Sequence, residues 1–97
     1  MPNTEQTTIL SSDGQVKAGP GYVSWILVVA EGTGGAWQLN DGLTDGGSGS
    51  DLVSGVEAAN TTHFIRFGAL NDGALRFGTG IFADIPGTNV TLTVGYA

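Results

Sequence analysis

The sequence has no cysteine, which excludes a disulfide framework and a thiolate metal site. Charge is also scarce, because Asp, Glu, Lys and Arg make up 12% of the 97 residues, against about 25% in a typical soluble protein. Nine acidic residues outweigh three basic ones, Lys17, Arg66 and Arg76, so the net charge is -6. Nucleic acids and anionic membranes attract basic surfaces, so neither is an expected partner.

Long apolar runs and helical periodicity are missing as well. The longest apolar run, residues 23–30, is too short to cross a bilayer. The first residues, MPNTEQTT, have neither the basic nor the apolar region of a signal peptide, so none is expected.

The sequence is rich instead in short alternating segments separated by glycine. The clearest is residues 90–96, where apolar residues alternate with threonine and glycine; its apolar positions are Val90, Leu92, Val94 and Tyr96. This period of two predicts a strand with one buried face. About eight or nine such segments recur roughly every 8–12 residues. The pattern predicts an all-β fold, an antiparallel β-sandwich, with a jelly-roll arrangement as one form of it.

The expected organisation is a flexible arm over residues 1–8 and a single domain over residues 9–97. Residues 22–30 predict a central strand in which Val23, Trp25, Leu27 and Val29 share one face, with Trp25 in the core. Both faces of this strand are apolar, so a second sheet or a neighbouring subunit should cover them. Residues 74–77 and 81–85 predict a hairpin around Gly78-Thr79-Gly80. A small domain without disulfides commonly gains stability by forming homo-oligomers.

One metal-binding motif is present. Residues 46–54, GGSGSDLVS, match the calcium-binding nonapeptide G-G-x-G-x-D-x-U-x. In that motif the ion lies between consecutive repeats, and a single copy cannot supply its roughly six to eight oxygen ligands. The favoured interpretation is a flexible loop, with an irregular calcium site at Asp41, Asp45 and Asp51 as the weak alternative.

No catalytic residue and no cofactor are predicted. His63 is the single histidine, and Ser48 lacks the final glycine of a G-x-S-x-G nucleophile elbow. Glu31, Glu57 and Asp84 could supply a carboxylate pair for glycoside hydrolysis, but so small a fold makes this the weakest alternative. We therefore expect a protein that is not an enzyme.

Contact with a partner is the more promising role for several residues. Trp37 follows a glycine-rich turn, so it could lie in the core or offer a surface contact, including a platform for a sugar ring. Arg66 and Arg76 lie within predicted strands; they could face solvent, pair with Asp72 or Asp84, or serve as interface anchors. The polar arm could become ordered on docking, and its candidate residues are Asn3, Thr4, Glu5 and Gln6.

Three segments carry a family resemblance: EGTGGAWQLNDG at 31–42, LRFGTGIFA at 75–83 and VTLTVGY at 90–96. Their order over about residues 22–97 resembles the small glycine-rich β-sandwich proteins of tailed bacteriophage virions, including capsid decoration or cement proteins. The resemblance implies a non-enzymatic virion protein, made in the host cytoplasm, that stabilises the head through protein–protein contacts. Its implied partners are further copies of itself, with a trimer favoured, and the major capsid protein. A tail or fibre component, or a carbohydrate- or calcium-binding β module, remains an alternative.

Overall fold

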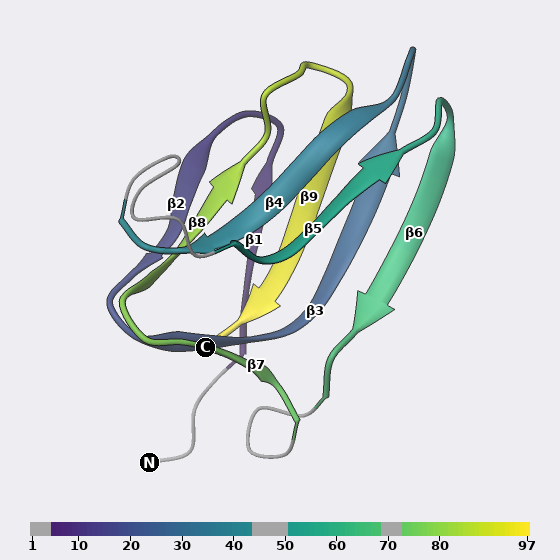
Figure 1. The fold of residues 1–97 in the computed structure, drawn as a ribbon. Helices are drawn as coiled ribbons and strands as arrows, with labels where there is room; N and C mark the ends of the chain where they lie inside the picture. The colour runs from purple at the N-terminus through teal and green to yellow at the C-terminus, as the bar shows by residue number, and fades with distance from the viewer. Residues whose placement is uncertain (1–4, 44–50, 69–72) are drawn as a thin grey trace.

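The computed structural model describes residues 5–43, 51–68 and 73–97. This part of the chain forms nine strands (Figure 1), listed here in chain order: β1 (Gln6–Leu10), β2 (Gly14–Ala18), β3 (Gly21–Ala30), β4 (Gly35–Asp41), β5 (Asp51–Glu57), β6 (Thr61–Arg66), β7 (Leu75–Phe77), β8 (Gly80–Asp84) and β9 (Val90–Tyr96). The strands predicted at 22–30, 74–77, 81–85 and 90–96 correspond to β3, β7, β8 and β9, and their boundaries differ by at most one residue.

The strands form two antiparallel sheets that pack face to face (Figure 1). The five-stranded sheet has the order β1-β9-β3-β6, with β7 also paired to β3, and the four-stranded sheet has the order β2-β8-β4-β5. The predicted all-β sandwich is confirmed. The described residues contain no helical segment with the length and hydrophobicity that crossing a bilayer requires.

The core lies between the sheets and is built mainly from β3 and β9. Every second residue of β9 points inward, so Val90, Leu92 and Val94 are completely or almost completely buried. Their cross-strand partners Ala30, Val28 and Ile26 point the same way from β3. Alternation in these strands therefore arises from a sheet with one face against the core and the other face outward.

A β-bulge in β3 changes which residues share a face. Val23 pairs with Tyr96, and Trp25 pairs with the adjacent residue of β9, Gly95. Ser24 is therefore the extra, unpaired residue of the bulge in β3. Val23 therefore points into the core, whereas Trp25 points outward with Leu27 and Val29. The predictions that Val23 shares a face with Trp25, and that Trp25 lies in the core, are wrong.

The repeated motif IRF at 65–67 and LRF at 75–77 occupies one edge of β3 twice. Residues of β6 pair with Trp25–Ala30, and β7 pairs with Gly21–Val23. Strand β8 pairs with β2 and β4 in the other sheet, so the predicted hairpin of 74–77 with 81–85 is wrong. The chain crosses between the sheets at residues 78–80, and local turn signals do not distinguish such a crossing from a hairpin.

The N-terminal strand shortens the predicted arm. Strand β1 pairs with β9 from Gln6↔Tyr96 to Leu10↔Leu92, so residues 6–8 belong to the sheet and not to an arm that ends at residue 8. The ladder forms because residues 6–10 offer backbone groups to the free edge of β9, although their composition is mostly polar.

Replacing Gly55 tests the packing of the core. Gly55 lies opposite Trp37, and an added Cβ would come 2.9 Å from the indole ring, which is 2% exposed and has nowhere to move. Gly55→Ala should lower the free energy of unfolding by about 1–3 kcal/mol through overpacking. The measurement is urea unfolding, with Gly87→Ala as the control because a Cβ there meets nothing within 4 Å. Equal midpoints for the two variants would contradict the packing described here.

Candidate protein-binding face

The outer face of the five-stranded sheet presents a row of three apolar side chains and one threonine. Leu27 lies opposite Phe64 of β6 on one side and Thr93 of β9 on the other, and Thr93 lies opposite Ile9 of β1. The row thus crosses all four long strands of the sheet. Ile9 is 67% exposed and Phe64 is 56% exposed, so the row ends in two large hydrophobic residues that water contacts. Exposed apolar residues that cluster in this way commonly mark an interaction site.

Trp25 lies in the neighbouring row and packs against Phe64. The two ring centroids are 5.8 Å apart, and the ring planes are tilted by 33°. The indole lies over Gly95, where any Cβ would overlap it, so this glycine provides the space that the ring occupies. The aromatic pair therefore has a fixed geometry on the surface of the sheet.

A carboxylate holds the Trp25 indole in place. Glu5 Oε1 accepts a hydrogen bond of 2.6 Å from Trp25 Nε1 and one of 3.1 Å from the Ser24 hydroxyl. The Ser24 hydroxyl also lies 3.2 Å from the Gly95 carbonyl oxygen. The polar edge of the ring is satisfied within the chain, which leaves the apolar surface of the ring for a partner.

The two arginines complete this surface. Arg66 lies opposite Trp25 and Arg76 lies opposite Tyr22, so both guanidinium groups extend from the outer face. We define the docking face by seven outward residues: Ile9, Tyr22, Trp25, Leu27, Phe64, Arg66 and Arg76. Large aromatic residues and arginine are the residue types that dominate binding energy in protein interfaces.

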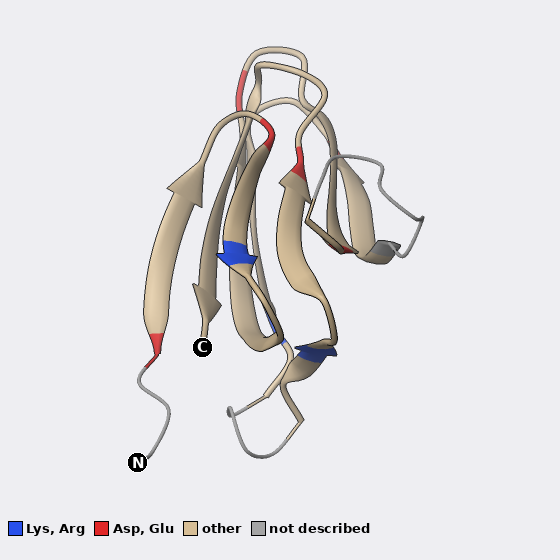
Figure 2. Cartoon of the chain, turned by 90° about the vertical axis from the view of Figure 1, so that its left-hand side faces the viewer, with Lys and Arg blue, Asp and Glu red and all other residues tan. Residues whose placement is uncertain are grey.

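The outer face of the four-stranded sheet differs in character. Its central row pairs Ser54 with Gln38 and Gln38 with Asp84, whereas its edge strand β5 presents the exposed apolar residues Leu52 and Val56. Figure 2 shows that Lys and Arg lie toward the end that holds the termini, whereas most described acidic residues lie at the opposite end. Exposed apolar side chains of the four-stranded sheet therefore lie at its β5 edge, whereas those of the docking face come from strands across the five-stranded sheet.

Trp37 is not available for a partner, which corrects its prediction as a contact residue. Its side chain is buried in the core, and Nε1 donates a 3.1 Å hydrogen bond to Glu57 Oε2. The same carboxylate oxygen lies 3.6 Å from His63 Nδ1, so the three residues link β4, β5 and β6 at one side of the sandwich. Of the two positions that the sequence allows for Trp37, the core is the one it occupies, where its ring points inward against Gly55.

Asp41 acts as a backbone clamp, which weakens the calcium alternative. Its carboxylate accepts hydrogen bonds from the backbone N–H groups of Gly78 (3.0 Å), Thr79 (2.7 Å) and Gly80 (3.3 Å). These bonds hold the crossing between β7 and β8. Asp45 and the Asp51 side chain lie outside the described residues, and in the described part no three His, Cys, Asp or Glu side chains are grouped to hold a metal ion.

The predicted arm residues divide into two groups. Asn3 and Thr4 lie outside the described residues. Glu5 contacts Trp25, and Gln6 Oε1 accepts a 3.4 Å hydrogen bond from the Tyr96 hydroxyl. Glu5 therefore borders the docking face, whereas Gln6 shares the face of Tyr96, which points into the core, and the contact of either residue with a partner stays a prediction.

Sequence reasoning missed Ile9, Trp25 and Phe64 as surface residues. The available signal was the two-sided apolar character of β3, which required a cover over both faces. This apolar character did not indicate which face of β3 the second sheet would cover. Comparison of the chain with protein-family models, curated proteins and solved structures found no match.

The Asp41 clamp predicts a pH-dependent contribution to stability. The N–H donors of Gly78, Thr79 and Gly80 lower the pKa of Asp41 below its ordinary value of 3.8. A lowered pKa in the folded state stabilises the fold above the unfolded value, and this contribution is lost as the pH falls through the folded value. Asp41→Asn should therefore cost about 1 kcal/mol near neutral pH, and the difference in Tm from the native chain should shrink below about pH 4.

The matched control for this measurement is Glu31→Gln, which removes one exposed charge that makes no side-chain contact among the described residues. A Tm difference for Asp41→Asn that stays constant from neutral to acid pH would refute the ionic character of the clamp.

Proposed function

We propose that this chain is a structural protein of a phage virion that binds another protein through the docking face, with decoration of the capsid as the leading assignment. The observation that carries the proposal is the exposed row from Ile9 through Leu27 to Phe64, with Trp25 and two arginines beside it. The family resemblance supplies the virion context, and the docking face supplies the means of attachment.

The shape of this face suits a protein partner. A row of side chains that spans a sheet is broad and shallow, which matches the surface of a folded protein better than a small ligand. A decoration protein stabilises a shell by mass action, because it binds the assembled form and not the dissociated subunits. Burial of the exposed parts of Ile9 and Phe64 would contribute to this binding, at roughly 25 cal/mol for each Å² of apolar surface.

The expected homo-oligomer would use a different surface. Strand β5 is an edge strand of the four-stranded sheet, and its outward Leu52 and Val56 are 40% and 81% exposed. Val56 lies opposite Ala36, which adds further apolar surface at this edge. Self-association there, as the favoured trimer, would leave the docking face free for the major capsid protein.

Replacing Phe64 tests the docking face. Heads that lack this protein, taken from the phage that encodes it, should bind the native chain and melt at a higher temperature when it is bound. Phe64→Lys should weaken binding by about 10- to 1,000-fold, which corresponds to about 1–4 kcal/mol at an interface anchor. Sedimentation with heads measures the binding, and scanning calorimetry measures the melting temperature.

The control for that experiment is Thr88→Lys, which adds the same charge at an exposed turn. Equal binding by both lysine variants would contradict the role of the docking face. Binding to tails and not to heads would favour a tail component. Binding to a glycan array that depends on Trp25 and Phe64 would favour the carbohydrate alternative.

Replacing Val56 tests the oligomer. Size-exclusion chromatography with light scattering should give the mass of a trimer for the native chain, and Val56→Lys should reduce it to that of a monomer while Thr88→Lys does not. The mass should be the same with calcium and with chelator. A native monomer would reject self-association through β5, and a mass that changes with calcium would support the calcium-binding alternative.

A further inference from the structure

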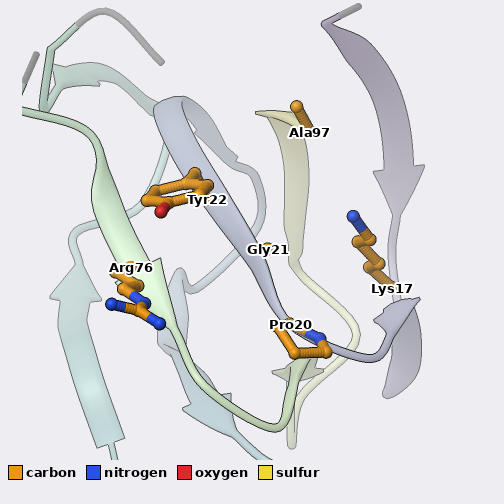
Figure 3. Close-up of a pocket in the computed structure, with 6 residues that line it drawn as sticks. All are labelled: Lys17, Pro20, Gly21, Tyr22, Arg76 and Ala97. Atoms are coloured by element: carbon orange, nitrogen blue, oxygen red, sulfur yellow. The ribbon is translucent and has the colours of Figure 1, made fainter. Parts of the chain in front are cut away.

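A pocket lies at the end of the docking face where β3 begins. It has a volume of about 180 Å³ and is lined by Lys17, Pro20, Gly21, Tyr22, Arg76 and Ala97. Figure 3 shows Tyr22 and Arg76 on one side of Gly21 and Lys17 on the other, so two cationic side chains border the hollow from different strands. Tyr22 and Arg76 also belong to the docking face, which makes the pocket continuous with it.

The charge of this pocket is opposite to that of the chain. Two of the three basic residues border it, in a protein with a net charge of -6. Among the described residues no carboxylate lies within ion-pair distance of Lys17 or Arg76. Within residues 5–43, 51–68 and 73–97 neither cation has an ion-pair partner that would compete with an external anion, and the acidic surface elsewhere would direct an anion toward this end of the molecule.

The floor of the pocket is backbone held in a fixed position. A Cβ on Gly21 would lie 2.7 Å from the Ala97 carbonyl oxygen and 2.9 Å from Lys17 Cδ, so no side chain fits there. Tyr22 and Ala97 exchange two backbone hydrogen bonds, of 2.9 and 3.0 Å, beside this position. A site with such a fixed frame loses little conformational freedom when it binds a ligand.

We propose that this pocket binds a carboxylate from an acidic segment of the protein that the docking face covers. Arg76 offers the planar fork that suits a carboxylate, and Lys17 offers a second positive charge across the pocket. The inference rests on the proposed function for the identity of the partner. The pocket would then fix the orientation of the protein on its partner, while the apolar row supplies most of the buried area.

The first test uses the isolated protein. Backbone amide NMR shifts of the isotope-labelled native chain are followed during titration with N-acetyl-glutamate and, separately, with inorganic phosphate. N-acetyl-glutamate should give saturable shifts centred on Gly21, Tyr22 and Ala97, and Arg76→Gln should weaken this binding at least about tenfold. Arg66→Gln is the matched control, because Arg66 lies on the same face but does not line the pocket.

Saturable shifts that need Arg76 and not Arg66 would support the proposal. Two results would overturn it: no saturable shift at these amides, or binding of phosphate at least about tenfold tighter than binding of N-acetyl-glutamate, which would make the pocket a phosphate site.

The second test uses heads. The double variant Lys17→Gln, Arg76→Gln should lose at least about tenfold in affinity, and the salt dependence of binding should decrease. Loss of binding in Phe64→Lys with full binding in the double variant would reject the carboxylate pocket and keep the docking face. Saturable N-acetyl-glutamate binding by a protein that binds no heads would reject the capsid assignment and keep an anion pocket.

Discussion

The bulge at Ser24 is the constraint on which the outer surface of the sheet depends. One extra residue in β3 reverses the alternation, so Val23 enters the core while Tyr22 and Trp25 both point outward. The Ser24 carbonyl oxygen accepts hydrogen bonds from the N–H groups of Phe67 (2.8 Å) and Gly68 (3.3 Å). These bonds hold the backbone that directly follows β6 against β3. Without the bulge, the residues of the docking face would not share one surface.

The fold could be predicted from the sequence at the level of single strands. Periodicity and turn residues are local properties, and they located β3, β7, β8 and β9 to within one position. Pairing is not local. The segment 75–77 has the same alternation whether it pairs with β8 or β3, and where it crosses to β8 the Asp41 carboxylate bonds to the amides at 78–80. That contact joins residues 37–39 positions apart in sequence.

The candidate site was predicted in part. Arg66 and Arg76 were singled out because a charge inside an apolar strand must point to a surface or to a partner, and both extend from the outer face. The sequence predicts Trp25 in the core and leaves Trp37 open between the core and the surface, because both lie inside strands that carry apolar residues. Burial of Trp37 depends on a glycine in another strand, and exposure of Trp25 depends on the bulge, and neither feature has a signature in the sequence.

The position of β9 has a consequence for the making of the molecule. The last strand of the chain lies at the centre of its sheet, between β1 and β3, and the contact of Gln6 with Tyr96 joins residues 90 positions apart. Until residues 90–96 have been synthesised, β1 and β3 each have one edge without its partner strand. Assembly of this sheet must therefore await the synthesis of residues 90–96, and contacts of such long sequence separation make folding slow. Until β9 is inserted, the edges of β1 and β3 are open to pairing with other chains.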